Sequence, residues 1–159
     1  MKRFVDQLRK ADLVATVGLG VSLILARLAA YSLFQVGVRT EVLLRDAITL
    51  IEQVEQLPKQ AALLAFSFPP YSRDTAVAVA RAKERRVPVL LVTDGPQSPL
   101  VASAASVIFV RTENILYTNS ISGVAVLINA LATELALVNK SRALHQLRAS
   151  NKAIRGEYL

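Results

Sequence analysis

Three hydroxyl side chains lie close together near the middle of the sequence, at Ser67, Ser72 and Thr75. They follow an apolar run, residues 61–66, that is typical of a buried strand, and they precede residues 76–86, which have the composition of a helix. A strand-to-helix junction leaves backbone N–H groups without partners, and the helix dipole favours an anion there. The spacing therefore predicts a phosphate-binding loop. Capping of the helix by Ser72 is the structural alternative, and it is compatible with this role because it uses the same donors.

A second loop with similar chemistry occupies residues 18–22, where two glycines are followed by Ser22. Gly20 would let the backbone approach an anion closely. A dinucleotide-binding fingerprint would need another glycine at the position of Leu23, and Glu41 begins the second predicted strand instead of an acid ending it. A nicotinamide cofactor is therefore not expected, and a tight turn with a capping serine is the alternative.

A third loop, residues 93–100, contains Asp94, which could contact a ligand hydroxyl but more often structures such a turn. An aldose–ketose isomerase would also need a tuned general base. Glu113, just past the fifth predicted strand, is a weak catalytic candidate and could equally be a solvated or capping residue. His145 is the only histidine and lies among basic residues, which favours a solvated position. Glu134 lies within an apolar helix, where we expect its charge to have a partner.

The composition of the 159-residue chain suits one domain, residues 1–159, with a sizeable core. Hydrophobic residues make up 53% of the chain, mostly Ala, Val, Leu and Ile, which favours a buried parallel sheet between helices. The absence of cysteine excludes disulfides, cysteine-based zinc sites and thiol nucleophiles, and it agrees with a cytoplasmic location. No segment reaches the roughly 18–20 apolar residues of a membrane span. We expect no metal and no cofactor.

The net charge of +7 is concentrated at the two ends of the chain. Residues 1–10 hold four cations and one acid, for a net +3, and residues 140–159 hold five cations and one acid, for a net +4. The core, residues 11–139, is therefore neutral. Basic surfaces can indicate nucleic-acid binding, but solvated helical ends are the favoured interpretation, since no recognition helix or interleaved aromatic set accompanies them.

Short apolar runs alternate with helical patterns along the chain. The predicted strands are residues 13–18, 41–44, 62–67, 88–93 and 107–111. The predicted helices are residues 2–10, 22–35, 46–55, 73–86 and 120–149, with a short helical turn at 99–104. Gly37 fits a helix stop and Asp46 fits an N-cap. This alternation predicts right-handed crossovers and a five-stranded parallel sheet in a three-layer α/β/α domain of flavodoxin-like or Rossmann-like topology.

The predicted helix 120–149 is apolar on nearly every face over its first two thirds. A helix of this kind needs cover on all sides, and one sheet covers only one of them. The pattern therefore predicts an obligate dimer or a larger homo-oligomer. If the first and third strands are neighbours in the sheet, the loops that follow them, with their serines, face one pocket.

Taken together, these segments resemble the sugar isomerase (SIS) phosphosugar-binding domain. Residues 18–22 are similar to its glycine–serine loop, and residues 67–75 to its serine-rich phosphate loop. Prolines at Pro69 and Pro70, followed by residues 71–75, look like the RpiR-type transcription regulators. Other segments similar to that group are residues 93–94, 98–100, 119–120 and 127–131.

The resemblance implies a domain that associates as dimers or larger and binds a sugar phosphate. The implied phosphate-binding residues are Gly20, Ser22, Ser67, Ser72 and Thr75, with Asp94 and Glu113 as sugar-contact candidates. Pro69 and Pro70 remove two N–H donors from the loop, and Pro69 also replaces a hydroxyl. A ligand-binding sensor domain of a regulator is favoured, with a phosphosugar isomerase and a non-binding dimerisation module as alternatives. DNA would be contacted through a helix-turn-helix domain outside these residues, whether the chain is an excised or a free-standing domain.

Overall fold

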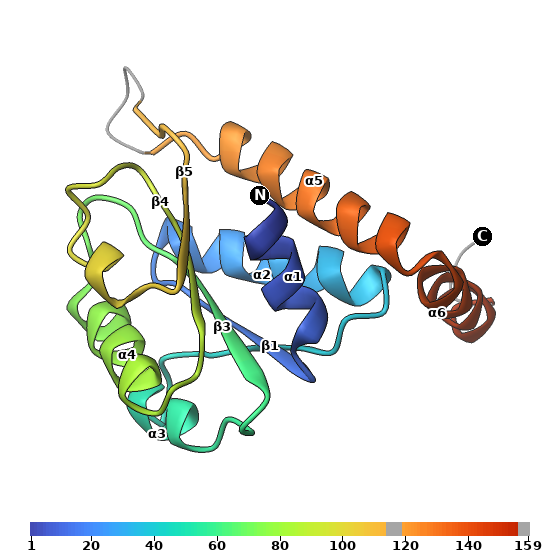
Figure 1. The fold of residues 1–159 in the computed structure, drawn as a ribbon, viewed down its shortest axis with the longest axis horizontal. Helices are drawn as coiled ribbons and strands as arrows, with labels where there is room; N and C mark the ends of the chain where they lie inside the picture. Colours follow the sequence, from blue (N-terminus) through green and yellow to red (C-terminus); the bar gives the residue numbers. More distant parts are fainter. Residues whose placement is uncertain (114–118, 156–159) are drawn as a thin grey trace.

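Five parallel strands form one sheet at the centre of the computed structural model, which describes residues 1–113 and 119–155 (Figure 1). The strands, in sheet order, are β2 (Thr40–Val42), β1 (Leu13–Val17), β3 (Ala61–Phe66), β4 (Val89–Thr93) and β5 (Ser106–Phe109). The predicted parallel α/β fold is confirmed, and every predicted strand is present with its ends shifted by at most two residues.

Helices cover both faces of this sheet. The helices on one face are α1 (Lys2–Lys10), α2 (Val21–Gln35) and α5 (Ser122–Val138). Those on the other face are α3 (Leu50–Glu55) and α4 (Arg73–Glu84), beside a short 3-10 turn, η1 (Val101–Ser103). The last helix, α6 (Lys140–Ala153), follows α5. The three-layer arrangement follows from strands that are apolar on both sides and therefore need cover on both.

The central strand β3 shows how the sheet feeds two cores. Its side chains alternate between the faces, as the period of an extended strand requires. Leu64 and Phe66 join the cluster under α1, α2 and α5. Leu63 and Ala65 join the cluster under α3 and α4. All six residues of β3 are buried, so the strand reads in the sequence as an unbroken apolar run.

The position of β1 determines where a ligand could bind. Val14 of β1 pairs with Thr40 of β2 on one side and with Ala62 of β3 on the other. The chain therefore leaves β1 toward one edge of the sheet and later crosses to the other. A crevice forms at such a switch point, outside the carboxyl ends of the two strands. The neighbouring arrangement of the first and third strands, on which the single pocket depends, is present.

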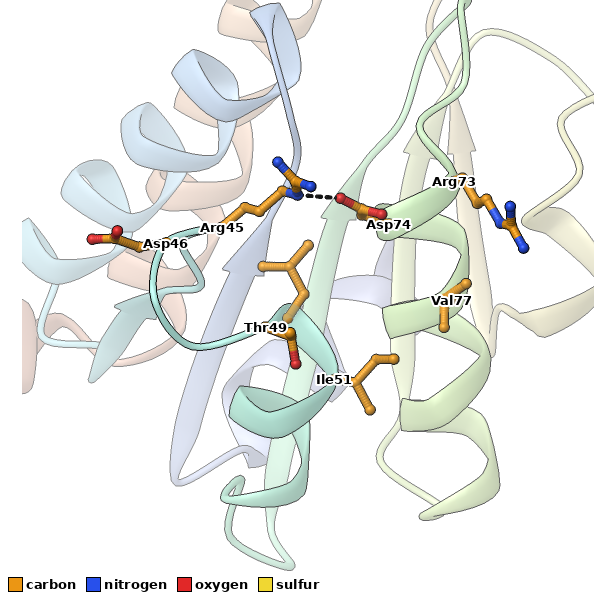
Figure 2. A pocket seen from close by; sticks show the side chains of 8 residues that line it. Arg45, Asp46, Thr49, Ile51, Arg73, Asp74 and Val77 are labelled. Carbon is orange, nitrogen blue, oxygen red and sulfur yellow. Dashed lines mark ion pairs between the residues drawn. The ribbon is translucent and has the colours of Figure 1, made fainter.

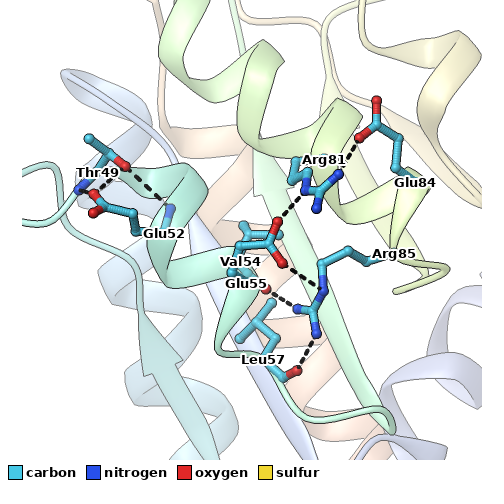
Figure 3. A network of polar contacts seen from close by, with 8 residues as sticks. All are labelled: Thr49, Glu52, Val54, Glu55, Leu57, Arg81, Glu84 and Arg85. Carbon is cyan, nitrogen blue, oxygen red and sulfur yellow. Dashed lines mark hydrogen bonds and ion pairs between the residues drawn. The ribbon is translucent and has the colours of Figure 1, made fainter.

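Helix α3 is shorter than the predicted helix 46–55, and the expected N-cap at Asp46 is wrong. The helix begins at Leu50, and Thr49 caps it. The Thr49 hydroxyl accepts a hydrogen bond from the Glu52 N–H at 3.2 Å, and the Glu52 carboxylate accepts one from the Thr49 N–H at 2.8 Å (Figure 3). This reciprocal capping box satisfies two N–H groups, whereas a cap at Asp46 would have no glutamate three residues on.

The predicted helix 120–149 is in fact two helices. Helices α5 and α6 are bent by 110° at a break centred on Asn139, whose φ and ψ are −133° and 63°. The Asn139 side chain accepts a hydrogen bond from the Arg142 N–H at 3.2 Å, so it caps α6. No single helix among the described residues has the length and hydropathy to cross a membrane; only α5 and α6 together reach them, and that pair is bent.

Candidate functional site

The loops that follow β1 and β3 meet at the carboxyl edge of the sheet, around a pocket of about 350 Å³. The first loop contributes residues 19–22, the second contributes residues 68–70 and Ser72, and Asn119 closes the rim. The N-termini of α2 and α4 both border the pocket, because Gly20 and Ser72 are their N-cap residues. The structure therefore brings the two predicted loops together.

The first loop requires glycine at two positions. A Cβ on Gly18 would lie 2.5 Å from the carbonyl oxygen of Ser22, so only glycine lets α2 begin directly above the end of β1. Gly20 has φ 60° and ψ −130°, a conformation that other residues rarely adopt, and no atom lies within 4 Å of the position of a Cβ there. The space above Gly20 belongs to the pocket, with Ser22 beside it.

The second loop combines a capping hydroxyl with two unpaired ones. Ser72 caps α4, its hydroxyl accepting a hydrogen bond from the Thr75 N–H at 3.3 Å. The hydroxyls of Ser67 and Thr75 are buried and have no hydrogen-bond partner among the described residues. Ser67 and Thr75 are only 3% and 1% exposed, and they do not line the pocket. A buried hydroxyl without a partner costs roughly 1–3 kcal/mol, so both groups retain hydrogen-bonding capacity for another oxygen.

Asn119 is a pocket residue that the sequence analysis did not single out as a site residue. Its side-chain N–H donates to the carbonyl oxygen of Pro69 at 2.6 Å, across fifty positions of sequence. Its side-chain oxygen accepts from the hydroxyl of the buried Thr112 at 3.1 Å. The one signal available was its place, shortly after the fifth predicted strand and so at the same edge of the sheet as the two serine loops.

Asp94 is held inside its own neighbourhood. Its carboxylate accepts hydrogen bonds from the Tyr71 hydroxyl at 2.8 Å, from the Thr93 hydroxyl at 3.0 Å and from the Gln97 amide at 2.7 Å. Partial burial, together with the bond to Asp94, raises the pKa of Tyr71 to about 12. Asp94 thus ties the loop after β4 to the loop after β3, as the turn interpretation predicts, and it does not line the pocket.

The other acid–base candidates lie away from the pocket. Glu113 is exposed and does not line it. His145 is exposed on α6, and Glu134 is exposed on α5, without an ion pair among the described residues. Within those residues, no group of three or more His, Asp or Glu side chains could hold a metal ion. The described lining of the pocket thus offers hydroxyls, an amide and backbone dipoles, and no titratable side chain.

A separate pocket of about 350 Å³ lies between the start of α3 and the start of α4 (Figure 2). Arg45 forms an ion pair with Asp74 across it, while the side chain of Arg73 points away from that pair. The ion pair fixes the connection after β2 against the first turn of α4, where an acid also suits the helix dipole. The two pockets share no lining residue, so this one supports the second loop from behind.

Comparison with known proteins agrees with this geometry. The model of the SIS domain family matches residues 7–134. The chain belongs to the SIS domain family. The matched span includes both serine loops, all five strands and most of α5 of this SIS domain. A comparison with curated protein sequences gives no match.

Three solved structures illustrate the relationship. An RpiR transcription factor from Sphaerobacter thermophilus, in its sugar isomerase domain, is 32% identical with a TM-score of 0.90, over 95% of this chain and 84% of that one. The Vibrio vulnificus NanR protein complexed with ManNAc-6P is 18% identical with a TM-score of 0.86, over 99% of this chain. A protein of E. coli CFT073 in complex with a sugar phosphate is 18% identical with a TM-score of 0.70, over 87% of this chain and 77% of that one.

The chain spans 60% of the length of the NanR protein, so that protein contains regions with no counterpart here. At 18% identity, the likeness to the NanR and E. coli proteins shows a shared fold. The likeness to the RpiR domain is closer in both sequence and structure and agrees with the resemblance seen in the proline-containing loop.

Proposed function

We propose that this SIS domain is a sugar-phosphate sensor of a transcription regulator and binds its ligand at the carboxyl edge of the sheet. The observation that carries the proposal is the convergence of two serine loops on one pocket at the β1–β3 switch point. Gly20, Ser22 and Ser72 line that pocket, and the unpaired hydroxyls of Ser67 and Thr75 lie behind it.

The phosphate would be held by dipoles instead of by charged side chains. The first turns of α2 and α4 both open toward the pocket, and their N–H groups and dipoles favour an anion. Phosphate oxygens would also accept from the Ser22 and Ser72 hydroxyls and, after a small rearrangement, from those of Ser67 and Thr75. Pro69 and Pro70 contribute apolar lining and no N–H groups, so we expect fewer phosphate contacts from the second loop than a proline-free loop would make.

The solved relatives support a ligand of this chemical class. The NanR protein was solved with ManNAc-6P and the E. coli protein with a sugar phosphate, and the more similar RpiR domain comes from a transcription factor. The sugar-contacting groups would lie toward Asn119 at the rim, with Glu113 further out. DNA reading by the full regulator would belong to a helix-turn-helix domain outside these residues.

The position of the titratable groups favours a sensor over an isomerase. An isomerase must place a base within hydrogen-bond reach of the proton that it moves. Asp94 is occupied by three hydrogen bonds, Glu113 is exposed, and His145 lies on α6. None of these carboxylates or imidazoles lines the pocket.

A sensor also needs an arrangement that its ligand can shift, and we propose a homodimer in this role. Large apolar side chains remain exposed on the neighbouring helices α2 and α5, and the main ones are Ile24, Tyr31, Phe34, Val126 and Leu137. Covering this face with a second copy would complete the burial that the apolar α5 requires. A ligand that binds one dimer arrangement more tightly shifts the population toward it. Sedimentation showing only monomers at micromolar concentration would contradict the dimer.

A thermal-unfolding screen tests the binding proposal. Sugar phosphates are compared with the same sugars without phosphate and with inorganic phosphate. A ligand at roughly one hundred times its dissociation constant should stabilise the domain by about 2.7 kcal/mol. The decisive variants are Ser67→Ala and Ser72→Asp. The aspartate keeps an acceptor for capping α4 but places a negative charge where the phosphate would bind. Ser98→Ala is the matched control, because Ser98 has a buried, unpaired hydroxyl away from this pocket.

The three possible functions give different results in this screen. A phosphate-dependent shift that both site variants lose and Ser98→Ala keeps, without conversion of the sugar, supports the sensor. Conversion between aldose and ketose phosphates would indicate the isomerase. A well-folded protein that no sugar phosphate stabilises would overturn the proposal in favour of a dimerisation module.

A further inference from the structure

The geometry points to a second binding surface: we infer that the amino edge of the sheet, together with α6, binds the phosphate backbone of duplex DNA without reading its sequence. This goes beyond the proposed sensor function and does not depend on sugar-phosphate binding, since the two surfaces lie at opposite edges of the sheet. It would add a non-specific contact to whatever a separate DNA-reading domain supplies.

A row of cations runs along the amino edge. The connections that precede β2, β1, β3 and β4 carry one exposed cation each in sheet order, and these are Arg39, Lys10, Lys59 and Arg86. Backbone hydrogen bonds hold three of these connections together, from the Val14 N–H to the Arg39 carbonyl and from the Asp12 N–H to the Gln60 carbonyl, each at 2.9 Å. With neighbouring strands about 4.8 Å apart, the row spans roughly 15 Å.

Helix α6 adds a second group of cations at the same edge. Its exposed cations are Lys140, Arg142, Arg148 and Lys152, and the helix contains no acidic residue. A cavity of about 200 Å³ places the start of α6 there, because Arg142 and Asn139 line it together with Arg9, Ala11 and Val38 from the connections before β1 and β2. Figure 1 shows α6 at the end of α5, beyond the layers that cover the sheet.

These eight cations are unneutralised among the described residues, since none of them takes part in an ion pair there. The acids near this edge are already used by other arginines. Asp6 lies 3.8 Å from Arg9, and Glu55 pairs with Arg81 and Arg85 (Figure 3). Asp12 is the one exposed acid in the four connections before β2, β1, β3 and β4.

The pattern fits a duplex better than other partners. A row of about 15 Å with an adjoining basic helix suits a polyanion of regular charge spacing, for which lysine and arginine contacts to phosphate supply non-specific affinity. A second copy of the chain would be repelled by the same charges. Single-stranded nucleic acid is disfavoured because none of the connections in the row carries an aromatic side chain for base stacking.

The test measures binding of the whole chain to a fluorescent duplex of mixed sequence and to a scrambled duplex, by anisotropy over a range of salt concentrations. The edge variant carries Lys10→Gln, Arg39→Gln and Lys59→Gln. The matched control carries Arg27→Gln, Arg73→Gln and Arg111→Gln, which remove three exposed cations outside the amino edge that likewise have no ion pair among the described residues. Vesicles containing anionic lipid are measured in parallel, because α6 also exposes Leu144, Leu147 and Ile154.

We expect equal binding to both duplexes at low salt. The edge variant should lose about tenfold or more in affinity, and its dependence of log K on log salt should be shallower by about 3, or 0.9 for each lost contact. The control variant should keep most of the affinity. Equal losses in both variants would reduce the effect to net charge and overturn the proposal, as would no binding at low salt. Tighter binding to vesicles through the same cations would replace DNA with a lipid surface.

Discussion

At the carboxyl edge of the sheet, charged side chains neutralise one another and leave a pocket of hydroxyls and backbone dipoles, whereas at the amino edge cations remain unpaired. Arg45 pairs with Asp74, and Asp94 is bound by Tyr71, so the serine pocket has no titratable side chain among its described lining. At the other edge, Arg39 and Lys59 face solvent without an ion pair among the described residues. One sheet thus offers an anion two different environments.

The difference indicates the kind of anion that suits each edge. Fixed dipoles act over a few ångströms and select a small phosphate by geometry, so salt should affect them little. Unpaired surface cations attract any polyanion over about a Debye length, roughly 8–10 Å at ordinary salt, and salt screens them. The two proposed sites should therefore respond differently to ionic strength as well as to mutation.

The largest effect should come from the glycines that shape the two edges. Gly18→Ala forces a Cβ to within 2.5 Å of the Ser22 carbonyl oxygen, and a backbone contact of this kind cannot move aside. We expect it to lower the free energy of unfolding by about 3 kcal/mol. Gly37→Ala, at the amino edge, must adopt φ 85° but meets only the flexible side chain of Arg142, and should cost about 1–2 kcal/mol.

Urea unfolding of both variants measures this comparison. Equal losses, or a larger loss for Gly37→Ala, would show that the first loop can relax around a side chain and that its close approach to α2 is not needed.

The bond between Tyr71 and Asp94 should give the next largest effect. Removing it with Tyr71→Phe should cost about 1.5 kcal/mol at pH 7, because one acceptor is charged. The folded pKa of Tyr71 lies near 12, above the ordinary value of 10.0, so its stabilisation is complete below pH 10 and is lost as the pH rises to 12.

Urea unfolding at neutral pH and an absorbance titration of tyrosinate both check this prediction. Tyr31→Phe is the control, since Tyr31 is 63% exposed on α2. The variant at Tyr71 should remove a transition near pH 12. A stability equal to that of the control would mean that the third loop holds its shape without this bond.

The capping of α3 should produce a smaller change. Thr49→Ala removes the capping box and should cost about 1 kcal/mol, whereas Asp46→Ala should cost less than about 0.5 kcal/mol. Thermal unfolding of the two variants decides between the cap that the structure shows and the cap that the sequence suggested. A larger loss at Asp46 would contradict the start of the helix at Leu50.

The strands could be predicted because each buried parallel strand is an unbroken apolar run that needs no knowledge of its neighbours. Errors arose where two local solutions compete. Asp46 and Thr49 are both residues suited to an N-cap, and only the glutamate three positions after Thr49 separates them. The bend at Asn139 has no glycine or proline to announce it, and an asparagine that caps α6 looks, in the sequence, like any polar residue of a long helix.

The candidate site divides in the same way. Both serine loops are contiguous segments at the ends of strands, so their place could be predicted from the sequence. The contact of Asn119 with Pro69 joins residues fifty positions apart, and the contact of Tyr71 with Asp94 joins residues twenty-three apart. Contacts of this kind depend on the strand order, and so does the burial that places Ser67 and Thr75 behind the pocket lining.

The smallest effect should come from Glu55, the acid that neutralises two arginines near the amino edge (Figure 3). Its hydrogen bond with Arg81 lowers the pKa of Glu55 below the ordinary value of 4.5. A lowered pKa means that the stabilisation is present above pH 4.5 and is lost as the pH falls through the folded value. Glu55→Gln should therefore lower the melting temperature slightly at neutral pH and leave it unchanged in acid.

The same variant also tests the contrast between the two edges. Glu55→Gln adds one unneutralised positive charge near the amino edge, so binding to duplex DNA at low salt should tighten while stability falls. Glu113→Gln removes an equal charge from an exposed position past β5, at the carboxyl edge, and should change DNA binding less. If Glu113→Gln tightened binding as much, the attraction would depend on the net charge of the whole chain and not on where its cations lie.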